Sequence, residues 1–312
     1  MPSPPADVNP DALIRDARAG QDEALGSGLA ASQADAGRSA SLSQTTPAMI
    51  MGAATVDIPA IVLSGGPMLD GHFGGGLAGS GTIVWYAREE LAAGRIDMEQ
   101  FIEMVASSAP SVGHCNTMGT ALSMNSMAEA LGMSLTGCAA IPGPYKQRGQ
   151  MAYETGKRIV EMVWEDLRPS KILTRAAFDN AIVAASALGA STNCPPHVNA
   201  IARHAGVELL NADWDKQGYD VPLLVNCMPA GKYLGEAFYR AGGVPAVMAE
   251  LLAHGKLRGE AMTVTGRTMA ENLATAPRAD GEVIKGYDKP MLQQAGFAVL
   301  SGNLFDSAIM KT

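Results

Sequence analysis

Apolar and polar positions alternate along most of the chain in a pattern typical of helices separated by short buried segments. Apolar residues recur every three to four positions, the spacing of one helix face. This pattern predicts helices over 98–107, 117–132, 146–167, 174–188, 196–205 and 233–254. The clearest is 146–167, where an apolar stripe among charged residues consists of Met151, Ile159, Val160 and Val163.

Two continuous apolar runs, 58–63 and 221–225, predict buried strands. A glycine-rich segment, 71–81, follows the first run, and residues 296–305 have the pattern of a strand and a turn. Strands that alternate with helices predict an α/β fold with a mainly parallel sheet flanked by helices.

The first 44 residues differ from the rest of the chain. They are rich in Ala, Ser, Gly, Asp and Pro and show no strand pattern. This composition predicts a disordered or atypical N-terminal segment over 1–44. The alternating pattern begins near Thr45.

Composition and charge narrow the class of protein. The 312 residues include 31 acidic and 23 basic side chains, a net charge of −8. No basic patch is evident, so we expect neither a nucleic-acid partner nor an anionic membrane surface. No apolar run reaches about 18 residues and no signal-peptide pattern is present, so we expect no membrane span. The four cysteines form no Cys-x-x-Cys pair, which argues against a zinc ribbon or a thioredoxin motif and favours a reducing cytoplasm.

Cys115 is the first candidate for chemistry. Small and polar residues from Ser111 to Gly119 lead into a predicted helix, which places Cys115 at a helix N-terminus. The free N–H groups and dipole there favour a thiolate, the form that binds metals or attacks electrophiles. A structural cysteine beside a cap is the alternative, and His114 is expected to be structural.

The glycine-rich loop and two polar clusters are further candidates. Backbone N–H groups of the loop over 70–82 could hold an anion, although it matches neither a Walker A loop nor a GxGxxG fingerprint, and a flexible loop is the alternative. Ser191, Thr192 and Asn193 could cap a helix or bind substrate hydroxyls or a carboxylate. Lys232 follows the second predicted strand, where open α/β sheets bind ligands, but it could equally be solvated.

The other three cysteines lie in apolar or Gly/Pro surroundings and are interpreted as core residues. They are Cys138, Cys194 and Cys227.

Taken together, the motifs resemble those of the dihydroxy-acid dehydratase and phosphogluconate dehydratase (IlvD/Edd) family. The similarity runs from Thr45 to Thr312. The motif sequences are most similar to those of the sugar-acid branch of the family, the arabinonate and xylonate dehydratases. The most specific matching stretches are Ser64-Gly-Gly-Pro-Met, Gly79-Ser-Gly-Thr, Gly113-His-Cys-Asn-Thr-Met-Gly, Gly189-Ala-Ser-Thr-Asn and Pro229-Ala-Gly-Lys-Tyr.

The resemblance implies a hydro-lyase that dehydrates a 2,3-dihydroxy carboxylate, either a sugar acid or a dihydroxy acid, to a 2-oxo acid. A base takes the C2 proton and a Lewis acid helps the C3 hydroxyl to leave. Family members hold an iron–sulfur cluster with three cysteines and a Mg²⁺ ion with acidic residues and a carbamylated lysine. Their base is a serine in a C-terminal β-barrel domain, and they are typically homo-oligomers.

When the family's cluster-binding, magnesium-binding and catalytic roles are assigned to matching positions of this chain, most of them find no matching residue. Cys115 matches the third cluster cysteine, whereas the family's Cys-Asp-Lys motif reads Leu42, Ser43, Gln44 here. The first cluster cysteine belongs to an upstream stretch that residues 1–44 do not resemble. Residues 45–290 match the α/β dehydratase domain and 291–312 only the start of the barrel domain. We therefore expect no retained metal ligand, no bound cluster or Mg²⁺, and an inactive chain.

The similarity begins abruptly, one residue after the altered motif, which suggests a frameshift or a misplaced gene start. The upstream DNA is then expected to encode Cys-Asp-Lys in another frame. Three hypotheses follow: a dehydratase-family chain truncated at both ends, a non-catalytic remnant that associates with a full-length paralogue, and a small-molecule binding module that uses the loop over 71–81.

Overall fold

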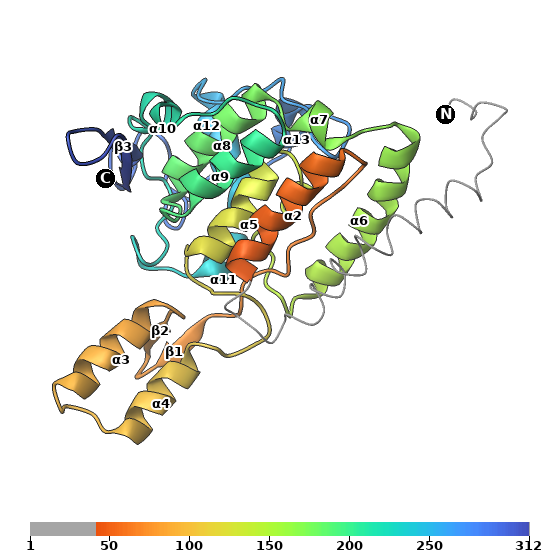
Figure 1. Cartoon of the computed structure of the whole chain (residues 1–312). Helices are drawn as coiled ribbons and strands as arrows, with labels where there is room; N and C mark the ends of the chain where they lie inside the picture. The colour runs from red at the N-terminus through yellow and green to blue at the C-terminus, as the bar shows by residue number, and fades with distance from the viewer. Residues whose placement is uncertain (1–41, 312) are drawn as a thin grey trace.

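The computed structural model describes residues 42–311, and this part of the chain is mainly helical (Figure 1). Its helices are α2 (Leu42–Val56), α3 (Thr82–Ala92), α4 (Met98–Ser107), α5 (Thr120–Ala130), α6 (Lys146–Trp164), α7 (Pro169–Ile172), α8 (Arg175–Leu188), α9 (Cys194–His204), α10 (Asn211–Gly218), α11 (Gly235–Arg240), α12 (Gly243–Ala253) and α13 (Met269–Leu273). Its strands are β1 (Gly71–Phe73), β2 (Gly76–Ala78), β3 (Phe297–Leu300) and β4 (Ala308–Lys311). The prediction of disorder for 1–44 falls almost wholly outside the described residues, and positions 42–44 begin α2.

Helices α5 and α8 form the centre of the core. They pack against each other, α2 and α9 cover α5, and α10 and α12 pack on α8. Every residue of α5 from 121 to 130 is buried, and so is most of α8. A helix that is apolar or small on all sides can be covered on all sides, which explains the central position of this pair.

Most of the helices expected from periodicity are present. Five of the six predicted segments correspond to α4, α5, α6, α8 and α9, with ends shifted by a few residues. The sixth, 233–254, is wrong as one helix, because the chain forms α11 and α12 with a break between them. Gly242 and Gly243 have φ of 107° and 59° at the break, a left-handed conformation that ends a helix.

The expected mainly parallel sheet is wrong for the described residues. Their named strands form two separate antiparallel pairs, β1–β2 and β3–β4. The run 58–63 forms no strand, and its Val62 N–H donates to the Met133 carbonyl at 2.8 Å. The run 221–225 forms only two isolated antiparallel bridges, Leu223 with Leu292 and Val225 with Ile284. An apolar run indicates that a segment is buried but not which segment lies beside it. Here the backbone groups of the two runs form hydrogen bonds with helix ends and loops rather than with neighbouring strands.

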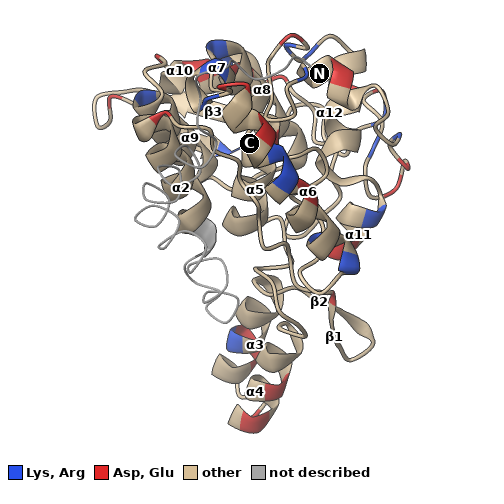
Figure 2. Ribbon diagram, turned by 90° about the vertical axis from the view of Figure 1, so that its right-hand side faces the viewer, with Lys and Arg blue, Asp and Glu red and all other residues tan. Residues whose placement is uncertain are grey.

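The glycine-rich segment is a hairpin rather than a flexible loop. Strands β1 and β2 pair from Gly71 with Ala78 to Phe73 with Gly76. Gly74 and Gly75, with φ of 58° and 82°, form the two-residue turn, a conformation that glycine adopts without strain. This hairpin, α3 and α4 project from the main body (Figures 1 and 2).

The strand expected near the C-terminus is confirmed as β3, which pairs with β4. Phe297 of β3 packs edge-to-face on Trp214 of α10, with ring centroids 5.1 Å apart. No helix within 42–311 is both long enough and apolar enough to cross a membrane.

Candidate functional site

Cys115 lies in the turn that precedes α5, not in the helix itself. The N-cap of α5 is Gly119, so the expectation of a cysteine at the helix N-terminus is wrong by four residues. The Cys115 side chain is partly exposed, whereas the other three cysteines are buried, as expected. The turn over 112–119, here called the Cys115 turn, is therefore the place where a thiol reaches the surface.

A buried hydrogen-bond chain holds this turn against α2. The Thr46 hydroxyl donates to Asn125 Oδ1 at 2.8 Å, and Asn125 Nδ2 donates to His114 Nε2 at 2.8 Å. Because Nε2 accepts, the proton is on Nδ1, which donates to the Cys115 carbonyl at 2.9 Å. Burial lowers the pKa of His114 to about 4, opposed by the Cys115 carbonyl and assisted by the charge of Arg148. A neutral His114 thus positions the backbone of Cys115.

Asn116 ties the same turn to the β-hairpin side of the molecule. Its Oδ1 accepts from the Ser80 N–H at 2.8 Å, and its Nδ2 donates to the Leu69 carbonyl at 3.0 Å. The Asn116 carbonyl accepts from the Gly235 N–H of α11 at 2.6 Å. Asn116 was not among the predicted site residues, and the signal that could have identified it is its place inside the matching Gly-His-Cys-Asn stretch.

The Ser-Gly-Gly-Pro-Met stretch lies alongside the turn. The His114 N–H donates to the Gly66 carbonyl at 2.9 Å, and the Met68 N–H donates to the His114 carbonyl at 2.8 Å. Gly66 has φ of 81°, and a Cβ there would lie 1.9 Å from the Ile141 carbonyl oxygen. Only glycine fits this close approach, which explains the residue type.

Ser191 and Asn193 meet the first turn of α5. Ser191 Oγ and Asn193 Nδ2 each lie 2.9 Å from Thr120 Oγ1. Asn193 is the N-cap residue of α9, but its side chain makes no capping hydrogen bond, so the capping explanation is wrong for this residue. Thr192 is exposed. The fold therefore brings this polar cluster beside the helix that follows the Cys115 turn.

Lys232 is exposed on a loop next to the turn. The Lys232 N–H donates to Asn226 Oδ1 at 3.0 Å, and the Met118 N–H donates to the Met228 carbonyl at 2.8 Å, which joins the loop to the Cys115 turn. Among residues 42–311 the Lys232 ammonium makes no ion pair. Its role as an anion contact stays a prediction.

For the described part of the chain, the expectation that neither an iron–sulfur cluster nor Mg²⁺ is bound stays a prediction. No group of three or more His, Cys, Asp or Glu side chains is placed there to hold a metal ion. Burial raises the pKa of Cys194 and Cys227 to about 12 each, which disfavours the thiolate needed for ligation. Cys138 Sγ lies 3.5 Å from Arg148 Nη1 in the core.

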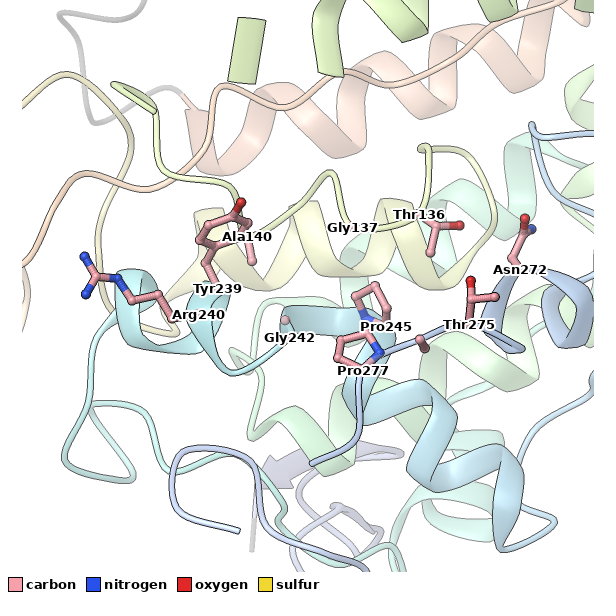
Figure 3. Close-up of a pocket in the computed structure, with 12 residues that line it drawn as sticks. Thr136, Gly137, Ala140, Tyr239, Arg240, Gly242, Pro245, Asn272, Thr275 and Pro277 are labelled. Carbon is pink, nitrogen blue, oxygen red and sulfur yellow. The ribbon is translucent and has the colours of Figure 1, made fainter. Parts of the chain in front are cut away.

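A separate surface pocket of about 440 Å³ opens elsewhere on the body (Figure 3). It lies between the segment around Thr136, the α11–α12 break and the segment around Pro277. None of the residues predicted from the sequence as a site lines it. The Cys115 turn and this pocket are therefore different features.

Comparison with known proteins identifies the family of the chain. Residues 40–272 match the sequence profile described as "Dihydroxy-acid/6-phosphogluconate dehydratase N-terminal", and the chain belongs to this family. Over 269 residues it is 62% identical to the D-xylonate dehydratase of Caulobacter vibrioides, covering 86% of this chain and 45% of that protein.

Two further relatives show the breadth of the similarity. The L-arabinonate dehydratase of Rhizobium leguminosarum is 49% identical over 84% of this chain and 45% of its own length. The dihydroxy-acid dehydratase of Caldanaerobacter subterraneus is 43% identical over 85% of this chain and 48% of its own length. The chain thus spans about half the length of these relatives.

Proposed function

We propose that this chain carries the N-terminal scaffold of a sugar-acid dehydratase and, by itself, does not catalyse dehydration. The whole-length activity would convert a 2,3-dihydroxy carboxylate such as D-xylonate to its 2-oxo acid. The observation that carries the proposal is the Cys115 turn. Its thiol is partly exposed, and hydrogen bonds of His114 and Asn116 hold the backbone around it.

Dehydration needs a base at C2 and an acid for the C3 hydroxyl. His114 is an unsuitable proton donor at neutral pH, because burial lowers its pKa to about 4 and both ring nitrogens already have partners. Ser191, Asn193 and Lys232 can contact hydroxyls or a carboxylate, and the proposal assigns them no proton transfer. The chain's own residues would therefore bind and orient a sugar acid without completing the reaction.

The test is iron and acid-labile sulfide per chain on protein purified without air, together with 2-oxo acid formation from D-xylonate and L-arabinonate. We expect a colourless protein, no product, and the same result for Cys115→Ser. A near-stoichiometric cluster that Cys115→Ser removes, or product formation by the wild-type chain, would contradict the proposal. Reading the upstream DNA in the other frames for Cys-Asp-Lys tests the frameshift hypothesis independently.

A second candidate function is association with a full-length paralogue. The observation that favours it is the set of large apolar side chains left exposed, Trp85 and Ile102 among them. Co-expression of a tagged full-length paralogue with this chain tests it. Recovery of both chains in a fixed ratio would support a non-catalytic partner, and recovery of the paralogue alone would contradict it.

A further inference from the structure

Lys311, the last residue of β4, places its ammonium at the end of α8. It donates to the carbonyls of Gly189, the C-cap residue, and of Ala190, the next residue. The C-terminal end of a helix carries a partial negative charge and carbonyls without intrahelical partners, so a cation is favoured there. A Cβ at Gly189 would lie 3.5 Å from the Lys311 nitrogen. The ammonium therefore holds the backbone where the chain leaves α8.

This lysine has no carboxylate partner within residues 42–311. Lys311 is half-buried, and burial lowers the pKa of its ammonium, opposed by nearby Cys194. Taking an ammonium out of water costs free energy that its hydrogen bonds must offset. Attachment of the hairpin does not require this cost, because Phe297, which pairs with Lys311 across the two strands, is already buried against Trp214. The two carbonyls are therefore the specific purpose of the lysine.

The two carbonyls directly precede the polar cluster of Ser191 and Asn193. The Ser191 N–H donates to Ser123 Oγ at 3.0 Å, and the Asn193 N–H donates to Ser191 Oγ at 3.2 Å. Ser191 Oγ and Asn193 Nδ2 each lie 2.9 Å from Thr120 Oγ1. Thr120 is the first residue of α5, directly after the Cys115 turn. A continuous path of peptide and hydrogen bonds thus leads from Lys311 to the helix that follows this turn.

We propose that Lys311 is a positioning residue for sugar-acid binding, which fixes the backbone before Ser191 so that Ser191 and Asn193 are held in place to contact the ligand. This inference rests on the proposed function, in which these two side chains contact hydroxyls or a carboxylate. Lys311 acts through the carbonyls of Gly189 and Ala190 and does not itself touch the ligand. Polar groups that bind a ligand must be held to within about 0.5 Å, so a shift of this backbone weakens binding.

Lys285 provides a matched control. Its ammonium also donates to a backbone carbonyl, that of Gly281, at 2.9 Å. Like Lys311, it makes no ion pair in the part of the chain that the structure describes. Its acceptor lies four residues away in the same loop, and the hydrogen bond of its ammonium does not reach residues 189–193. Loss of this ammonium therefore removes the same kind of hydrogen bond without affecting the polar cluster.

Amide hydrogen exchange over residues 189–193 of the full chain tests the positioning role. Lys311→Ala should speed exchange in this segment about tenfold or more, because hydrogen bonds from a charged donor are among the stronger ones. Lys285→Ala should leave exchange there unchanged. Added n-propylammonium, which matches the deleted atoms of Lys311 in size and charge, should restore slow exchange to Lys311→Ala. The uncharged n-propanol at the same concentration should not, which separates the ammonium from simple filling of space.

Binding of D-xylonate to the same proteins, measured by calorimetry or ligand-observed NMR, tests the link to the ligand. Lys311→Ala should raise the dissociation constant about tenfold, and n-propylammonium should reverse most of this change. Lys285→Ala should bind as the wild type does. Lys311→Met, which keeps the length of the apolar stem, should behave like Lys311→Ala and replaces it if that variant does not fold.

The outcomes separate this inference from the proposed function. Equal exchange over 189–193 in the wild type and the Lys311 variants would overturn the inference, and so would exchange that rises equally throughout the chain. Unchanged D-xylonate affinity in the Lys311 variants would also overturn it. A wild-type chain that binds no D-xylonate would contradict the sugar-acid part of the proposed function. Exchange that n-propylammonium alone restores would even then support Lys311 as the residue that positions the polar cluster.

Discussion

His114 shows how a side chain next to a candidate ligand can act without touching a substrate. Its two ring nitrogens bond Asn125 and the Cys115 carbonyl, so its role is to hold the backbone of the turn. The sequence interpretation of His114 as structural is consistent with this geometry. Its partners were not predictable, because Thr46 and Asn125 lie 79 residues apart and only packing brings them together.

Acid should destabilise the protein through His114. Its pKa is about 4 in the folded protein, whereas a histidine in an unfolded chain titrates near 6.5. The unfolded state binds more protons between these values, so the contribution is complete above about pH 6.5 and is lost as the pH falls to about 4. The loss is about 3 kcal/mol of unfolding free energy.

Urea unfolding across this pH range, for the wild type and His114→Gln, measures the effect. We expect the acid-induced loss to be smaller in the variant by about this amount. Glu129 titrates oppositely, since burial raises its pKa to about 7 and its contribution is lost as the pH rises, but both proteins keep it. Equal losses in the two proteins would refute the assignment.

Among the secondary-structure elements, apolar periodicity predicted well where helices lie but poorly whether a predicted helix is continuous. The amphipathic stripe of 146–167 corresponds to α6, whereas the apolar spacing over 233–254 continues across a real break. The reason is tertiary: a Cβ at Gly242 would lie 2.6 Å from Pro277 Cγ and 2.8 Å from the Ala246 Cβ. A left-handed glycine and a neighbouring loop together end α11.

Replacing Gly242 by alanine should therefore destabilise the fold. The φ of 107° and the contact with Pro277 together should cost roughly 1–3 kcal/mol. Gly156→Ala in α6 is the control, because a Cβ there meets nothing within 4 Å, and it should stabilise by up to about 1 kcal/mol. Denaturant unfolding of both variants gives the comparison, and a neutral Gly242→Ala would contradict the steric account.

In the molecule as a whole, the C-terminal hairpin is attached to the helical body by a few specific contacts. Phe297 is fully buried against Trp214, and the Lys311 ammonium donates to the carbonyls of Gly189 and Ala190 at the end of α8. The strand predicted near this end is β3, and it pairs with β4. Its docking on α10 was not predictable from a local pattern.

Phe297→Ala should loosen this attachment. Removing a buried aromatic ring leaves a cavity and should cost about 3–5 kcal/mol. Phe305→Ala, at a site that is 67% exposed in the same hairpin, should change stability by less than about 0.5 kcal/mol. Unfolding monitored by tryptophan fluorescence, which reports on Trp214, compares the two, and equal effects would argue against docking through Phe297.

Most helix positions, the burial of three cysteines and the family could be predicted from the sequence, because they depend on local periodicity, composition and short motifs. The packing of distant segments decided that the apolar runs join no parallel sheet, that Cys115 precedes α5, and that α3 and α4 project from the body with few buried residues. These outcomes depend on which distant parts of the chain pack together. The periodicity of apolar residues indicates that a segment is buried, but it does not identify the segment that packs against it.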